Sequence, residues 1–271
     1  MTLQYDKKVR LPERKNRLFQ KEEKIVPLNI WYYVSVFAAS IGGSLVQTTT
    51  GFGYGIFVML FFPLFLPLLQ SSALSSIISL WLSGSLAWKY RRHADFHAMW
   101  LPIVIYVTVS NVAVWLSTRV AVGGLKAYFG LFLILVAAYF MFFSNRIHLK
   151  ANPASAAVCT TISGVAGGFF GIGGPPMVLY FLALSGEDKL KYLATIQAFF
   201  FLTGISNVVS RAINGIITVE LLPLIIPGIA GMVIGQRIGL KIVGRIDIER
   251  LKKLIYCFLA IAGLLTFVTN I

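Results

Sequence analysis

The feature that most constrains this chain is a long stretch without a charged side chain. From Ile25 to Trp88, 64 residues contain no Asp, Glu, Lys or Arg. A helix rises about 1.5 Å per residue and the hydrocarbon core of a bilayer is about 30 Å thick, so this stretch is long enough for about three crossings. Further charge-free runs follow at residues 96–118, 127–145, 151–186, 192–210, 221–236 and 254–271. We count ten apolar segments and predict an all-α integral membrane protein.

The composition also favours a membrane protein over a soluble one. Charged residues make up 13% of the chain and hydrophobic residues 57%, whereas a soluble domain has about 25% charged residues. The net charge of +14 comes from basic residues in the N-terminal tail and in short loops, where membrane proteins set their orientation. We therefore expect a multi-pass protein of the cell membrane, whose partner is the lipid bilayer and not nucleic acid.

The first 26 residues differ from the rest of the chain. They hold eight Lys or Arg and four Asp or Glu, and they have no apolar stretch. We predict a solvated basic tail at residues 1–26, and not a signal peptide. Residues 27–271 are predicted to form a single membrane domain.

The two halves of this domain resemble each other at an offset of about 120 residues. The matching positions are Gly51 to Gly53 with Gly171 to Gly173, Gly84 with Gly204, and Arg91 with Arg211. Each half, about residues 28–145 and 151–271, holds five apolar segments, and an odd number of crossings turns the second half upside down. We predict two inverted-topology repeats with broken or re-entrant helices, an architecture common among secondary transporters.

Charge asymmetry predicts the orientation. By parity, one side carries eleven basic residues: Lys89, Arg91, Arg92, Arg146, Lys150, Arg237, Lys241, Arg245, Arg250, Lys252 and Lys253. The opposite side carries three: Arg119, Lys126 and Arg211. The first side is therefore predicted to be cytoplasmic. The same parity places the basic N-terminal tail outside, which the rule disfavours, so the side of the tail is left open.

Two glycine-rich stretches interrupt apolar segments at matching places in the two halves, at residues 42–55 and 164–176. Glycine weakens a helix, and proline cannot donate a backbone hydrogen bond. An unpaired peptide group in lipid costs several kcal/mol, so such a break survives only inside protein or beside a wet cavity. Paired breaks indicate a transport site near the bilayer midplane. Close helix packing is the alternative role for Gly42, Gly43, Gly167 and Gly168.

The breaks also indicate a negatively charged ligand. Segments that restart at Tyr54 or Pro175 would turn free N–H groups and a positive dipole end toward the membrane middle. All acidic residues lie in the tail, in loops or at segment ends, whereas cation and proton pathways usually need a carboxylate within the membrane. The predicted substrate-binding residues are Gln47, Thr48, Thr49, Gly51, Phe52, Gly53, Gly171, Ile172, Gly173, Gly174, Pro175, Gln197 and Asn207. Arg91 and Arg211 are expected either to attract or gate an anion or to extend into the headgroups.

The sequence has no pattern typical of an enzyme, a metal site or a cofactor site. The glycine-rich stretches lack the Gly-Lys-Ser/Thr ending of a phosphate loop. Every His and Asp is peripheral, and the His residues have no carboxylate partners at metal-binding spacing. Cys159 and Cys257 lie in apolar segments, where we expect small buried hydrophobic residues and not a disulfide. We therefore expect no catalysis, no metal and no cofactor.

At the broken segments the chain resembles the sulfite exporter TauE/SafE family of membrane permeases. The similar parts are Gln47 to Tyr54, Gly168 to Pro175, and Thr195 to Asn207. The resemblance spans about residues 30–271, and the long charged tail departs from the short apolar start usual in the family. The resemblance implies a permease for sulfur-containing anions such as sulfite, sulfoacetate or related organosulfonates.

We therefore expect a secondary transporter of a small sulfur-containing anion, working by alternating access around a midplane site. Two alternatives stay open. An anion channel would use the same donors but keep an open path. A membrane scaffold or assembly protein would use the glycines for packing alone. The exact anion, the direction, the coupling ion and whether the chain forms a homodimer are also left open.

Overall fold

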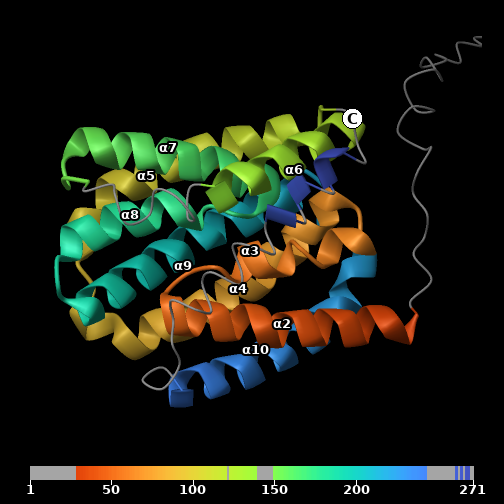
Figure 1. The fold of residues 1–271 in the computed structure, drawn as a ribbon, viewed down its shortest axis with the longest axis horizontal. Coiled ribbons are helices and arrows are strands. Elements are labelled where there is room, and N and C mark those ends of the chain that lie inside the picture. Colours follow the sequence, from red (N-terminus) through yellow and green to blue (C-terminus); the bar gives the residue numbers. More distant parts are fainter. Residues whose placement is uncertain are drawn as a thin grey trace, which may run out of the picture.

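The computed structural model describes residues 29–120, 122–138 and 149–242 (Figure 1). In the last apolar segment, residues 254–271, it describes residues 260, 261, 263, 264 and 266–268. The predicted N-terminal tail and most of the last predicted segment lie outside these residues. The described part is helical and contains no strand, as expected for an all-α protein.

The helices follow the apolar segments closely. The first half contains α2 (Ile30–Thr50), α3 (Tyr54–Val58), α4 (Leu68–Tyr90), α5 (Phe96–Ser117) and α6 (Val122–Ala138). The second half contains α7 (Pro153–Phe170), α8 (Gly174–Ser185), α9 (Lys189–Ile213) and α10 (Leu222–Ile242). Short 3₁₀ helices lie at Phe62–Leu64, Arg91–His93 and Val219–Leu221.

Within the described residues, five helices are long and apolar enough to cross a membrane: Ile30–Thr50, Phe96–Ser117, Pro153–Phe170, Lys189–Ile213 and Val219–Ile242. The surface of the bundle is correspondingly apolar, because large side chains such as Trp31, Val104 and Ile226 are more than half exposed. The interior instead contains many buried hydroxyl groups, several of them on α4. An apolar exterior around a partly polar interior is the arrangement expected of a protein that is solvated by lipid.

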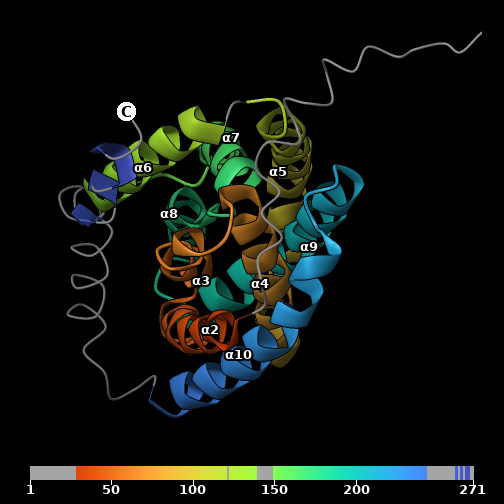
Figure 2. The ribbon, with the colours of Figure 1, turned by 90° about the vertical axis from the view of Figure 1, so that its right-hand side faces the viewer.

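The bundle is organised as helix pairs that join the two halves of the chain. Helix α2 packs along α10, α5 packs along α7, and α4 packs along α9. Figure 2 shows α4 near the middle, with α2 and α10 on one side and α5 and α7 on the other. The close α2–α10 contact depends on small residues, because a Cβ at Gly231 or Gly235 would collide with the Phe37 or Ile41 carbonyl oxygen.

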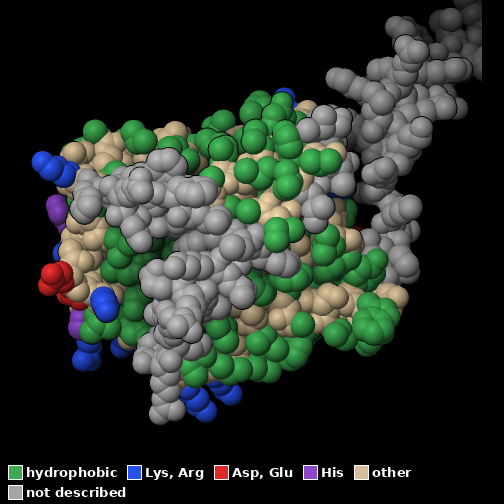
Figure 3. All heavy atoms as spheres, in the orientation of Figure 1, with side chains coloured by type: hydrophobic (Ala, Val, Ile, Leu, Met, Phe, Trp, Pro, Cys, Tyr) green, Lys and Arg blue, Asp and Glu red, His purple; other side chains and the backbone are tan. Residues whose placement is uncertain are grey.

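One end of the bundle carries most of the charge on the face drawn in Figure 3, and this is the end where α9 begins. Asp95 caps α5 by accepting a hydrogen bond from the Ala98 N–H at 3.0 Å. Its carboxylate also pairs with Lys191 Nζ of α9 at 3.0 Å. The hydrogen bond from Lys191 and that from Ala98 hold the pKa of Asp95 below its usual value. Helix α2 begins at the opposite end.

Candidate functional site

The first helix break lies between α2 and α3. Gly51 ends α2 with a φ of 87°, and its N–H donates to the Gln47 carbonyl at 2.8 Å. Gly53 precedes α3 with a φ of 105°. Both angles lie in the left-handed region that glycine adopts without steric cost. The sequence therefore places glycine where the backbone must reverse.

The second break lies between α7 and α8 and is built in a similar way. Gly171 ends α7 with a φ of 71°, and its N–H donates to the Gly167 carbonyl at 3.0 Å. Gly173 precedes α8, whose first turn contains Pro175 and Pro176. Since proline has no N–H, this turn offers fewer amide donors than the sequence led us to expect. The positive end of the α8 dipole lies at this break, next to the negative end of the α7 dipole.

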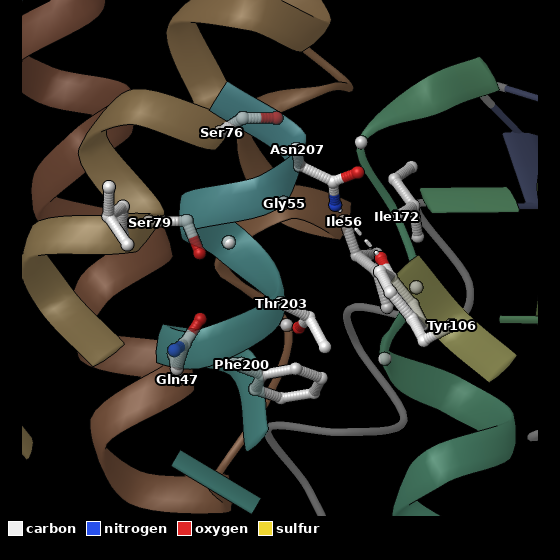
Figure 4. A pocket seen from close by; sticks show the side chains of 16 residues that line it. Gln47, Gly55, Ile56, Ser76, Ser79, Tyr106, Ile172, Phe200, Thr203 and Asn207 are labelled. Atoms are coloured by element: carbon white, nitrogen blue, oxygen red, sulfur yellow. Dashed lines mark hydrogen bonds between the residues drawn. The ribbon is translucent and has the colours of Figure 1, made fainter. Parts of the chain in front are cut away.

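The two breaks lie against each other. A Cβ built at Gly55 would lie 2.6 Å from the Gly171 carbonyl oxygen, and one at Gly174 would lie 3.5 Å from the Phe52 ring. A cavity of about 70 Å³ opens beside this contact, several times the space of about 10–15 Å³ that one water molecule needs. Its lining residues are Gln47, Gly53, Gly55, Ile56, Ser76, Ser79, Leu80, Tyr106, Gly171, Ile172, Gly173, Gly174, Phe200, Thr203, Gly204 and Asn207 (Figure 4).

The polar side chains of the cavity are all neutral. Asn207 Nδ2 donates to the Tyr106 hydroxyl at 3.1 Å, and these two groups point toward each other in Figure 4. Asn207 is only 7% exposed, and its Oδ1 has no hydrogen-bond partner. Ser76 and Ser79 reach the cavity from α4. No acidic side chain is among the lining residues, and the described part of the chain holds no group of His, Cys, Asp or Glu suited to a metal ion.

Gln47 and Gln197 connect the first break to α4 and α9. Gln197 Nε2 donates to the Gly51 carbonyl at 2.7 Å, and its Oε1 accepts from Gln47 Nε2 at 3.0 Å. Gln47 Nε2 also lies 2.9 Å from Ser83 Oγ. Gln47 lines the cavity and Gln197 does not. Gln197 therefore holds the backbone of the first break in place, and its direct contact with the ligand stays a prediction.

The other predicted residues divide between the cavity and its surroundings. Gly53, Gly171, Ile172, Gly173, Gly174 and Asn207 line it. Thr48 is buried against Gly239 of α10, and its hydroxyl has no partner. The Thr49 hydroxyl donates back to its own helix, at 2.9 Å from the Leu45 carbonyl. Thr48, Thr49, Gly51, Phe52 and Pro175 are not among the lining residues.

The glycines for which close packing was the alternative role do pack closely. A Cβ at Gly43 would lie 3.0 Å from Tyr54, one at Gly168 would lie 2.6 Å from the Ser110 carbonyl oxygen, and one at Gly167 would overlap the Tyr106 hydroxyl. Gly42 packs against Phe57. These four residues bring α3 close to α2, and α7 close to α5.

The two arginines have different surroundings. Arg91 is exposed, with its guanidinium 4.4 Å from the centre of the Trp88 ring. Arg211 is fully buried and does not extend into the headgroups. It donates to Ser72 Oγ at 2.6 Å and to the Gly167 and Gly168 carbonyls at 2.9 Å each. These carbonyls lie in the last turn of α7 and give the guanidinium acceptors inside the protein.

Sequence reasoning missed several lining residues: Ser76, Ser79, Tyr106, Phe200 and Thr203. A signal for two of them is present, because serines recur on α4 at spacings of three and four residues, typical of one polar helix face. Tyr106 and Phe200 carry no such signal, because aromatic residues occur throughout these segments.

Comparison with known proteins agrees with this architecture. The model of the family described as sulfite exporter TauE/SafE matches residues 36–266. No curated protein and no solved structure matches the chain. Since the family match covers nearly the whole bundle and several described helices can cross a bilayer, the chain belongs to the sulfite exporter TauE/SafE family and is a multi-pass membrane protein of that transporter family.

Proposed function

We propose that this protein is a secondary transporter of small sulfur-containing anions, such as sulfite or an organosulfonate. The observation that carries the proposal is the meeting of two helix breaks at a cavity lined by neutral hydrogen-bonding groups. A cavity without a carboxylate suits an anion better than a cation or a metal. Its volume of about 70 Å³ suits a ligand of a few heavy atoms.

The anion would be held by backbone and side-chain donors together. Tyr54, Gly55 and Ile56 form the first turn of α3, whose amides have no acceptor within that helix. Ser76 and Ser79 supply hydroxyl groups. A half-turn of the Asn207 amide would face its NH₂ group to the anion, while the Tyr106 hydroxyl would donate to its Oδ1. That rotation would satisfy the atom that now lacks a partner.

Alternating access is supported by the way the two halves pack. In two inverted repeats, α2 would correspond to α7 and α5 to α10. The contacts of α2 with α10 and of α5 with α7 are then equivalent contacts, related by exchange of the halves. We propose that one set of pairs moves relative to the other and exposes the cavity to each side in turn.

The charged end of the bundle would face the cytoplasm. Arg91, Arg92 and Lys150 all belong to the side with more basic residues, and Lys191 is bound to Asp95 at the turn between α4 and α5. The start of α2 would then lie on the outer side. No carboxylate lies inside the described part of the bundle, so the anion would either carry its own proton or follow its gradient and the membrane potential.

Uptake into proteoliposomes tests the proposal. The purified chain is assayed with sulfite, sulfoacetate, thiosulfate and sulfate, against empty vesicles. Saturable uptake of at least one of these anions is the expected result. Uptake of none of them, or uptake of a divalent cation instead, would refute the assignment, and a rate far above that of transporters would indicate a channel.

A cavity-filling variant separates transport from a scaffold role. A Cβ at Gly173 would lie 2.7 Å from the Tyr106 hydroxyl, so Gly173→Leu should fill the cavity and abolish uptake. Val104→Leu is the matched control, because Val104 on α5 is 57% exposed and does not line the cavity. Normal uptake by a folded Gly173→Leu protein would count against the cavity as the route.

A further inference from the structure

We propose that Arg211 is the fixed positive charge that the transported anion neutralises. This inference rests on the proposed function and adds the residue that makes the cavity selective for a charged ligand over a neutral one of the same shape. Within the described part of the chain the charge of Arg211 has no counter-ion. This charge lies behind the cavity, and the helix ends at the second break do not neutralise it.

Within the described part of the chain, Arg211 has hydrogen-bond partners but no counter-ion. It is fully buried, its three acceptors are a hydroxyl and two carbonyls, and its Nε has no partner. The described carboxylates lie near helix ends, and the ion pair found among them joins Asp95 to Lys191. A buried charge without a counter-ion is costly, so its presence at this position indicates a use.

The guanidinium lies one layer behind the cavity. Ser72, which accepts from Arg211 Nη1 at 2.6 Å, also packs against Gly171, because a Cβ there would lie 3.2 Å from the Ser72 carbonyl. Asn207 precedes Arg211 by one helical turn on α9 and lines the cavity. The field of the charge therefore reaches the cavity through a low-dielectric layer of protein, where it is weakly screened.

Helix dipoles do not supply the negative charge that would balance Arg211. Each break joins the C-terminal end of one helix, equivalent to about −0.5 charge, to the N-terminal end of the next, about +0.5. At the second break the two ends of α7 and α8 lie close together, so their partial charges largely cancel. Capping of α7 explains the hydrogen bonds of Arg211, but it leaves about one positive charge uncompensated. An anion in the cavity would balance it.

The first test compares a charged and a neutral ligand of equal shape on the wild-type protein. Methanesulfonate and methanesulfonamide compete for uptake of whichever panel anion the proteoliposomes take up. We expect methanesulfonate to compete at least about tenfold better. Equal competition by the two would overturn the inference while leaving transport itself intact, and this comparison depends on no variant. Absence of uptake of every panel anion would remove the proposed function and this inference with it.

The second test moves the charge. Arg211→Gln should abolish the preference for methanesulfonate, whereas Arg211→Lys should keep much of it. Ser72→Lys combined with Arg211→Ser returns the charge from the opposite helix and should restore the preference relative to Arg211→Ser alone. Thermal unfolding of each purified variant identifies those that are folded. A folded Arg211→Gln protein with the wild-type preference would overturn the inference, because a purely structural arginine affects stability and not ligand charge.

Discussion

Adding one methyl group at the tighter of two contacts between the helix breaks should impair the protein more than adding one at the looser contact. In Gly55→Ala the new Cβ would lie 2.6 Å from the Gly171 carbonyl oxygen, about 0.8 Å short of the 3.4 Å at which ordinary contact begins. That oxygen belongs to backbone at a glycine with a φ of 71°, so it cannot swing aside as a side chain would. Overpacking of this kind costs about 1–3 kcal/mol of stability.

The substitution should also slow transport in the protein that remains folded. A displacement approaching 1 Å at a binding site can cost about a hundredfold in rate, so we expect uptake by Gly55→Ala to fall by about tenfold to a hundredfold. Gly174→Ala is the matched control, because its Cβ would lie 3.5 Å from Phe52, so this second contact between the breaks leaves room for a methyl group in the same cavity. Initial uptake rates and thermal unfolding are measured for both. Equal uptake by the two variants would refute the role given to the tight contact between Gly55 and Gly171.

Three further predictions concern the surroundings of the cavity. Gly235→Ala should cost about 1–3 kcal/mol of stability, because its Cβ would collide with the Ile41 carbonyl between α2 and α10; an unchanged melting temperature would contradict this. Gln197→Leu should cost about 1–3 kcal/mol by leaving the buried Gly51 carbonyl without its donor, and should lower uptake, both measured on the purified protein. Asp95→Asn should cost at most about 1 kcal/mol, because the ion pair is partly exposed. Since the pKa of Asp95 is lowered in the folded state, the difference in melting temperature from wild type should be constant above the unfolded pKa of about 3.9. It should disappear as the pH falls through the folded value.

The helix breaks could be predicted because glycine and proline act through the backbone. Positive φ angles at Gly51, Gly53 and Gly171 are accessible to few other residues, so clusters of glycine in an apolar segment have a limited number of explanations. The similarity between the two halves also predicts that the two breaks occupy matching positions and share one site. The close approach of the two breaks in the structure agrees with that prediction of a shared site.

The cavity lining was harder to predict, because it depends on which face of a helix points inward. In a lipid-solvated bundle the outer face is as apolar as the packed one, so periodicity separates the two faces weakly. Thr48 and Thr49 therefore could not be told apart from Gln47, although only Gln47 lines the cavity. The burial of Arg211 could not be predicted either. Two of its acceptors are carbonyls in the last turn of α7, more than 40 residues away in the sequence.

The central claim is that the anion binds between the two breaks, and the position of a bound anion tests it directly. Selenite has the shape and charge of sulfite, and its selenium atom scatters X-rays anomalously. Crystals of the protein grown with selenite, at a concentration that inhibits uptake of the transported anion, should show an anomalous peak enclosed by Gly53, Ser76, Gly173 and Asn207. A peak found only at the charged end near Arg91, or no peak in the cavity at that concentration, would contradict the account.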